Sequence, residues 1–203
     1  MFEDKIKEAI KVLKKGGAVV YPTDTAYGLG VNALNSEAVQ NLYMIKEREN
    51  HKPTHIVVSD IEMAKEYVVV SPFAEKIMGK FLPGPISVVL PLKEDSSESL
   101  KQLSANSGSL GIRIPKDEVA ISLVRAAGFP ITTPSANITD GETPYKIETS
   151  KKQFETKMYQ PDYYLDVGEL PLKKPSTIVR IVGNDIELLR EGAIEFDTIK
   201  DIL

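Results

Sequence analysis

The chain has 203 residues, 42% of them hydrophobic and 27% charged, which suits one large globular domain or two small ones. Its formal net charge of −4 excludes a polycation, so contact with nucleic acid would need a local basic patch. The chain has no cysteine, which excludes disulfides, thiol catalysis and thiolate metal sites.

The first quarter of the chain alternates helical and strand patterns. Apolar residues recur at helical spacing at Phe2, Ile6, Ile10 and Leu13, and two glycines follow. This pattern predicts an amphipathic helix with a glycine cap. The segments after it are expected to be a buried strand at 18–21, a loop at 23–32, a helix at 36–48 and a strand at 55–58.

The middle of the chain carries clear start and stop signals. Residues 59–62 (SDIE) have capping-box form and open a helix, and Ser71-Pro72 opens another. Residues 83–85 (PGP) break that helix, and 86–92 read as a strand. Residues 94–109 are polar and serine-rich, and we expect them to form a mobile loop.

The remaining segments are rich in strand signals. They predict strands at 111–114, 129–132, 163–167, 177–182 and 186–189, a helix at 117–127, an amphipathic segment between the second and third of those strands, and a short closing helix. Helices and strands alternate without a repeat or a linker. We therefore predict one α/β (α+β) domain over residues 1–203, with a mixed sheet flanked by helices.

The chain shows no sign of export or membrane insertion. Residues 1–5 (MFEDK) are charged and lack an apolar signal segment, and no apolar run reaches the roughly 20 residues of a membrane helix. We expect a cytoplasmic protein without membrane contact.

The common cofactor motifs are absent. There is no glycine-rich phosphate loop, and Gly28-Leu29-Gly30 lacks the third glycine of a dinucleotide fingerprint. His51 and His55 are the only histidines and stand four apart around Pro53, which favours two loop histidines over a metal site. We expect no protein-held metal.

A basic cluster follows the helix at 36–48. Lys46, Arg48 and Lys52 are typical of a last helical turn, where cations complement the helix dipole. The same residues suit an anion site, in which arginine holds phosphate oxygens in a fork and lysine acts as a point charge. The local pattern leaves both interpretations open.

Arg113 lies between two isoleucines of a predicted strand, so its side chain points to the opposite face. If that face is covered, the guanidinium needs either an internal carboxylate or an external anion. Arg190, at another strand end, raises the same question, whereas Ser109 is consistent with a simple turn residue.

Small polar groups cluster at predicted strand ends. Residues 132–137 (TTPSAN) are typical of a turn, but open α/β sheets also bind ligands at such ends. Thr23, Thr25, Tyr27 and Ser176 offer similar groups. Together with the arginines and lysines, they predict a concave anion-binding site.

Several blocks in order resemble the YrdC/Sua5 family, the threonylcarbamoyl-AMP synthases. Residues 21–30 (YPTDTAYGLG) are similar to the family signature, and Lys46, Arg48, Ser135 and Asn137 look like its K-x-R…S-x-N tetrad. Further matching blocks are PGPISVVL at 83–90, GIRIP at 111–115, PSTIV at 175–179 and LREG at 189–192. The resemblance runs from about residue 16 to 192 and implies a single YrdC-like domain with a twisted mixed sheet.

The resemblance implies a reaction and a set of roles. L-threonine, bicarbonate and ATP would give threonylcarbamoyl-adenylate and pyrophosphate, with Mg²⁺ accompanying ATP, for t6A modification of tRNA at position 37. The tetrad would be catalytic: Lys46, Arg48, Ser135 and Asn137. Threonine would be held by Thr25, Arg113, Thr133 and Ser176. ATP would be held by Arg48, Lys52, Ser109, Ser135, Thr143 and Arg190.

The chain departs from the family in places. Glu49 stands where many relatives have proline, and Val57 stands where some have histidine. The chain resembles the short form of the family, without a further C-terminal domain. The implied partners are a downstream t6A transferase complex and tRNA, and the alternative function is a double-stranded RNA or tRNA-binding module without synthase activity.

Overall fold

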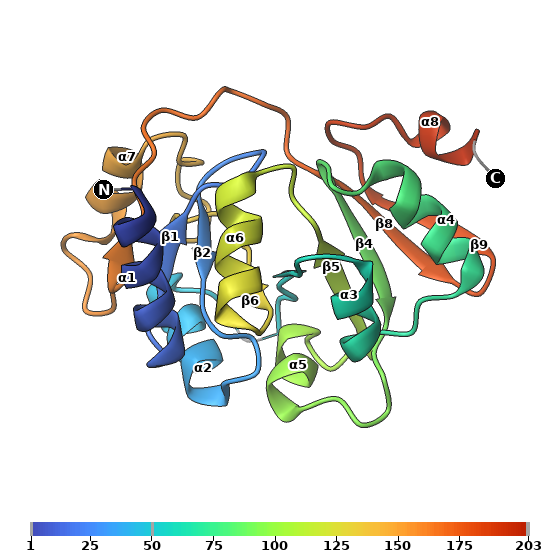
Figure 1. Ribbon diagram of the computed structural model, residues 1–203, viewed down its shortest axis with the longest axis horizontal. Coiled ribbons are helices and arrows are strands. Elements are labelled where there is room, and N and C mark those ends of the chain that lie inside the picture. Colours follow the sequence, from blue (N-terminus) through green and yellow to red (C-terminus); the bar gives the residue numbers. More distant parts are fainter. Residues whose placement is uncertain (1, 50, 202–203) are drawn as a thin grey trace.

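The computed structural model describes residues 2–49 and 51–201, and Figure 1 shows their arrangement. Met1, Asn50, Ile202 and Leu203 lie outside this part of the chain, as does the side chain of Phe2. Two twisted sheets with helices packed around them form the molecule, so the predicted α/β class with a mixed sheet is confirmed.

The smaller sheet has the strand order β2-β1-β7. Strand β1 (Val19–Tyr21) runs antiparallel to β2 (Gly28–Gly30) and parallel to β7 (Tyr163–Tyr164). Helices α1 (Phe2–Lys14) and α6 (Glu118–Ala127) pack beside it. One apolar cluster joins α1, α6 and strand β1. These two helices are the ones predicted from the apolar spacing between Phe2 and Leu13 and over residues 117–127.

The larger sheet has the order β6-β3-β5-β4-β8-β9. Its strands are β6 (Ile131–Thr132), β3 (Ile56–Val57), β5 (Ser109–Arg113), β4 (Ile86–Pro91), β8 (Thr177–Val182) and β9 (Asp185–Arg190). The β3–β5 and β4–β8 pairs are parallel, and the other three pairs are antiparallel. This arrangement brings strand ends from distant parts of the chain to one place.

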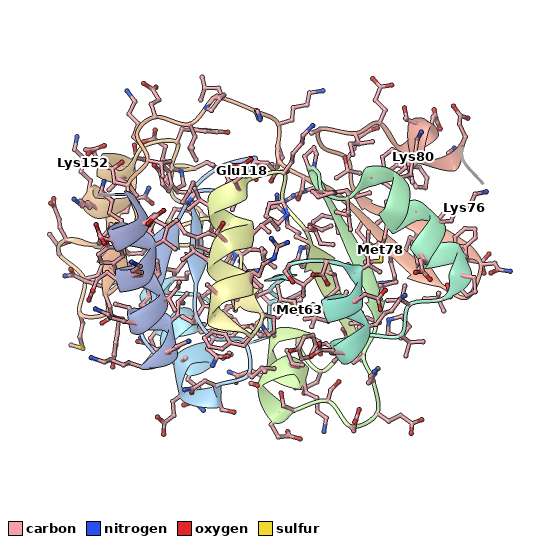
Figure 2. The ribbon with its side chains drawn as sticks, in the orientation of Figure 1. Met63, Lys76, Met78, Lys80, Glu118 and Lys152 are labelled. Carbon is pink, nitrogen blue, oxygen red and sulfur yellow. The ribbon has the colours of Figure 1, made fainter. Side chains whose placement is uncertain are left out.

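Helices cover the larger sheet. They are α3 (Ile61–Tyr67), α4 (Pro72–Phe81), α5 (Glu98–Leu103) and α8 (Phe196–Lys200). Helices α3 and α4 begin where predicted, and Ser71 caps α4, but Asp60 and not Ser59 of the predicted capping box caps α3. Figure 2 shows Met78 on the inner side of α4 and Lys80 on its outer side, as expected for an amphipathic helix.

The prediction of a loop over residues 23–32 was wrong, because strand β2 lies within it. Its two glycines are strand residues that allow a close approach. A Cβ on Gly30 would lie 2.8 Å from Cε1 of Tyr21, so only glycine leaves room for that ring. The missing side chain of Gly30 therefore allows β2 to pair closely with β1.

The prediction of a mobile loop over residues 94–109 was also wrong, because helix α5 lies within it. Ser97 is its N-cap, and the Ser97 side chain accepts a hydrogen bond from the Leu100 amide. Leu100 and Leu103 are buried one helical turn apart. Ser97 therefore acts as a capping residue, and the two leucines pack the helix on the core.

Helix α2 (Ser36–Ile45) ends earlier than the predicted 36–48, with Lys46 as its C-cap. Glu47 then adopts a left-handed conformation, with φ of 48°. This reversal turns the chain sharply after Lys46, so that Lys46 and Arg48 point in different directions.

A long connection joins the two halves of the molecule. Helix α7 (Ile147–Phe154) precedes β7, which is shorter than the predicted strand at 163–167. Residues 165–176 then cross from β7 to β8 over one edge of the molecule (Figure 1). We call residues 165–176 the strap.

Candidate functional site

A cavity of about 510 Å³ lies between the segments that join and end the two sheets. Its walls come from the β1–β2 loop, the segment before β3, the end of β5, the segment after β6, the strap and the end of β9. The volume is in the range of small-molecule sites. Four basic residues line it: Arg48, Arg113, Lys173 and Arg190. None of its described lining residues is Asp or Glu.

The cavity gathers most of the residues that the sequence singled out. Eight of the twelve residues to which the resemblance assigned a role line it: Thr25, Arg48, Arg113, Thr133, Ser135, Thr143, Ser176 and Arg190. Lys46 and Asn137 lie directly behind Ser135 and contact it. Lys52 and Ser109 are not among the residues that line the cavity.

Lys46 is buried and held by three acceptors. Its Nζ lies 2.6 Å from the carbonyl oxygens of Ser135 and Asn137 and 3.2 Å from Asn137 Oδ1. Burial, helped by the charge of Arg48, lowers the pKa of Lys46 to about 7. The three acceptors oppose that shift, because a neutral amine has only two N–H groups to donate. We therefore treat Lys46 as an ammonium group at neutral pH.

The same cluster fixes the loop that follows β6. Ser135 Oγ donates to Asn137 Oδ1 at 2.6 Å, and Asn137 Nδ2 donates to the Gly141 carbonyl at 2.7 Å. Thr139 donates its amide and its hydroxyl to the Lys46 carbonyl, both at 2.9 Å. Lys46, Ser135 and Asn137 thus form one internally bonded unit, which we call the lysine cluster.

Arg48 faces the cavity from the segment after α2. Its Nη2 donates to the Pro53 carbonyl at 3.0 Å, while its buried Nε has no partner among the described residues. Nearby, Lys52 Nζ lies 3.4 Å from Glu49 Oε2, and His51 Nε2 lies 3.1 Å from the same oxygen. Arg48 is thus held by one nitrogen, and a second remains available to a ligand.

Arg113 has an internal carboxylate partner, Asp24. Arg113 Nη2 lies 2.7 Å from Asp24 Oδ1 and 3.3 Å from Thr25 Oγ1. Asp24 Oδ2 accepts a hydrogen bond from the Lys116 amide at 3.1 Å. Both charged side chains are almost fully buried, with exposures of 7% and 4%. The Nε of Arg113 is buried without a partner, so the internal carboxylate does not use all of the fork.

Arg190 lies on the cavity wall opposite Arg113 and holds Ser176 there. Its Nη2 donates to the carbonyl and hydroxyl oxygens of Ser176 at 2.6 and 3.1 Å. Ser176 Oγ lies 3.2 Å from Ser87 Oγ. Burial and the neighbouring charge of Arg113 lower the pKa of Arg190. The two guanidinium groups therefore repel each other across the cavity, an arrangement that a bound anion would relieve.

Unpaired polar atoms point to a ligand in this cavity. Six buried side-chain nitrogen or oxygen atoms of the described residues lack a partner, and four belong to residues that line the cavity. These four are Arg48 Nε, Thr54 Oγ1, Arg113 Nε and Thr133 Oγ1. Buried polar groups in native proteins are normally hydrogen-bonded, so this concentration indicates a polar, anionic occupant.

The sequence interpretation missed several residues of the site, among them Asp24, Thr54, His55 and Lys173. Asp24 was visible only as part of the signature block, and Thr54 followed a proline in an expected connection. His55 was interpreted as a loop histidine, but it lines the cavity just before β3. Its position two residues before Val57, which pairs with Arg113, is the signal that places it on the same face.

No cluster of three or more His, Cys, Asp or Glu side chains suitable for a metal ion occurs among residues 2–49 and 51–201. Over the same residues, no helix is long and apolar enough to span a membrane.

Comparisons with known proteins agree with this geometry. The family model described as "Sua5_yciO_yrdC: Telomere recombination" matches residues 11–192. A protein of Methanocaldococcus jannaschii is 37% identical over 196 residues, which are 95% of this chain and 89% of that protein. The threonylcarbamoyl-AMP synthase of Bacillus subtilis is 29% identical over 202 residues, covering 99% of this chain and 57% of that protein.

A solved structure extends the likeness to three dimensions. Pyrococcus abyssi Sua5 complexed with L-threonine superposes with a TM-score of 0.90 at 29% identity. The match covers 99% of this chain and 58% of that one. The chain thus spans a little over half the length of the Bacillus and Pyrococcus proteins and nearly all of the Methanocaldococcus protein.

Proposed function

The chain belongs to the Sua5/YciO/YrdC family, and we propose that it is a threonylcarbamoyl-AMP synthase, an adenylating enzyme of the nucleotidyltransferase type. It uses L-threonine, bicarbonate and ATP to form threonylcarbamoyl-adenylate and pyrophosphate. The observation that carries this proposal is a cavity with four basic residues, no carboxylate among its described lining residues and four unpaired polar atoms. Such a cavity suits two anionic substrates held side by side.

We assign threonine to the wall formed by Arg113. The unpaired Nε of Arg113 would bind the threonine carboxylate, and Thr25, Thr133 and Ser176 would surround the amino acid. A relative of the same fold has been solved with L-threonine bound, which supports threonine as a ligand of this fold. Asp24 accepts a hydrogen bond from Arg113 and so holds its guanidinium group in position.

We assign ATP to the wall formed by Arg48 and Arg190, together with Ser135 and Thr143. Lys52 and Ser109 would contact ATP beyond the cavity as it stands. Lys46 and Asn137 would complete the tetrad from behind Ser135. The proposed Mg²⁺ would be held by the ATP phosphates, because it needs oxygen ligands and the described lining residues offer no carboxylate.

The chemistry asks for positioning and charge neutralisation. Threonine's amine captures the carbon of bicarbonate, and an oxygen of the resulting carbamate attacks the α-phosphorus of ATP while pyrophosphate leaves. Guanidinium groups fixed in a cavity stabilise the charge that develops on the phosphoryl oxygens. These requirements include no covalent catalysis, so the lack of cysteine in the chain is no obstacle.

We propose that residues 1–203 act as one YrdC-like domain and that the adenylate passes to a t6A transferase complex acting on tRNA in the cytoplasm. Direct tRNA or double-stranded RNA contact is part of this proposal. RNA binding without pyrophosphate release would instead favour a binding module.

The deciding experiment measures pyrophosphate release by the purified protein. We expect release only when ATP, threonine and bicarbonate are all present, with the adenylate detected by mass spectrometry. Release that does not depend on threonine would refute the assignment.

A further inference from the structure

His55 reaches the cavity from the residue before β3. Its backbone pairs with the segment after β6, since Thr133 donates its amide to the His55 carbonyl at 3.0 Å. Its ring lies against Gly111 of β5, where a Cβ would overlap the imidazole carbons. The absence of a side chain at position 111 is therefore what allows the ring to lie there. Within the described part of the chain, the imidazole makes no hydrogen bond, and His55 remains partly exposed through the cavity.

Three arginines surround His55, and no Asp or Glu is among the described residues that line the cavity with it. Its ring is exposed to the positive charges of Arg113 on β5, Arg190 on β9 and Arg48 on the segment after α2. Lys173 lines the same cavity from the strap. Asp24 is already used by Arg113 and by the Lys116 amide.

This arrangement poses a problem for threonine, whose amine carries a positive charge in water. An ammonium group in this cavity meets like charges, and no described lining residue supplies an anion to balance it. The cavity therefore favours the neutral amine. The neutral amine is also the form that can attack carbon, but the proton that it loses needs an acceptor.

We propose that a ring nitrogen of His55 accepts the proton that threonine's ammonium group must lose before its nitrogen attacks the bicarbonate carbon. This inference rests on the proposed function. The balanced step is ammonium plus bicarbonate plus neutral imidazole giving carbamate, water and imidazolium. The N–C bond forms, one C–O bond of bicarbonate breaks, and the leaving hydroxide takes a second amine proton as water. The amine must lose its proton whether carboxylation precedes or follows adenylation.

The surrounding charges keep His55 ready for this role. Burial, then Arg113, Arg190 and Arg48, lower the pKa of His55 to about 4, so the ring is neutral at pH 7 and can accept a proton. The phosphates of ATP and the carboxylate of threonine neutralise the same arginines when they bind. The pKa of His55 therefore rises toward its ordinary value of about 6.5 in the filled site, which strengthens it as a base.

The first test compares substitutions that separate shape from chemistry. His55→Phe keeps a ring against Gly111 but has no proton acceptor. We expect threonine-dependent pyrophosphate release to fall about a hundredfold at pH 7, as is typical when a general base is lost. We expect the loss to shrink as the pH rises, since the solvent then deprotonates the ammonium, while the KM for ATP is unchanged. Added imidazole should restore activity to His55→Ala.

His51→Phe is the matched control. His51 is the other histidine, its side chain is 76% exposed, and it pairs with Glu49 outside the cavity. It should keep wild-type activity and the wild-type pH profile. Thermal unfolding of each variant separates lost catalysis from lost folding.

The second test measures the pKa of His55 directly by imidazole NMR in the whole protein. We expect it to rise when threonine and a non-hydrolysable ATP analogue bind, with His51 as the reference in the same spectrum. Wild-type rates and pH profile in a folded His55→Phe, or a His55→Ala defect that imidazole does not restore, would overturn the inference. If the wild-type protein itself shows no threonine-dependent release, the proposed function fails instead.

Discussion

The lysine cluster and the Arg113 wall stand close together, yet they satisfy their polar groups in opposite ways. In the lysine cluster, the three protons of the Lys46 ammonium meet three oxygens of Ser135 and Asn137. On the Arg113 wall, Asp24 and Thr25 are the partners of Nη2, while Nε has none. A fully satisfied group is suited to holding structure, and a partly satisfied one is suited to binding a ligand.

The same contrast divides the K-x-R motif itself. Lys46 caps α2 and bonds inward, whereas Arg48, two residues later, faces the cavity with a buried nitrogen left over. The left-handed conformation of Glu47 separates the two directions. We infer that Lys46 positions the Ser135 loop and that Arg48 contacts the substrate, so motif members with similar charge have different roles.

We expect the largest effect from Lys46→Met in the lysine cluster. Methionine keeps the aliphatic chain but leaves the buried oxygens of Ser135 and Asn137 without their donor. We expect a loss of about 3 kcal/mol in the free energy of unfolding, the upper part of the range for buried groups left without partners. For a chain of this size, that is a fall of roughly 6–12 °C in Tm. Activity should fall more than about a hundredfold, because the Ser135 loop loses its support.

Lys46→Arg serves as the control, since it retains a charge but not the geometry. We expect intermediate stability in thermal and urea unfolding. A Lys46→Met variant with wild-type stability and no activity would reverse our assignment, because it would make Lys46 a substrate contact.

Arg113→Lys tests the wall on the other side of the comparison. Lysine can still pair with Asp24, but it offers a point charge in place of the fork. We expect the KM for threonine to rise about thirtyfold, which corresponds to roughly 2 kcal/mol for a charge-assisted hydrogen bond. The KM for ATP and the Tm should stay near wild type. An unchanged KM for threonine would reject the carboxylate role of Arg113.

Much of the fold was predictable because its signals are local. The helix predicted at 117–127 is observed as α6 at Glu118–Ala127, and its cap, Asp117, lies beside it in the sequence. Strand β2 was not predictable in the same way, because its glycines are explained by the ring of Tyr21 on the neighbouring strand. The cost or benefit of a glycine depends on a neighbour that only the folded sheet supplies.

The site was predictable to a similar degree. Strand alternation placed Arg113 on the face opposite its two isoleucine neighbours, but its partner Asp24 lies 89 residues away. The acceptors of Lys46 are mainly backbone carbonyls, which carry no sequence signal. The sequence therefore indicated residues that the fold gathers around one cavity. Which of them hold the structure and which are left to bind a ligand could be inferred only from their contacts.

Arg48→Ala should give a smaller effect than either change above. The variant loses one hydrogen bond to the Pro53 carbonyl and the unpaired Nε. We expect pyrophosphate release to fall at least about tenfold, equivalent to about 1.4 kcal/mol of transition-state stabilisation, with little change in Tm. Arg180→Ala is the control, because Arg180 pairs with Glu187 and does not line the cavity. A large loss of stability with unchanged activity would show that Arg48 stabilises the end of α2 and does not contact ATP.

The smallest predicted effect concerns Glu49. Its carboxylate lies 3.4 Å from Lys52 Nζ and 3.1 Å from His51 Nε2, and all three side chains are substantially exposed. Glu49 therefore offsets the positive charge of Lys52 beside the proposed phosphate path. Glu49→Gln removes that offset, so we expect the Kd for ATP to fall by up to about fivefold, the scale of an exposed ion pair.

A double-mutant cycle decides whether Lys52 carries this effect. If it does, Glu49→Gln should improve ATP affinity in the wild-type background and have little effect in Lys52→Ala. The improvement should also shrink in 1 M salt, where the screening length is about 3 Å. An equal gain in both backgrounds would show that Glu49 repels ATP directly, and Lys52 would then be an exposed surface residue like His51, with the ATP contacts confined to the cavity wall of Arg48 and Arg190.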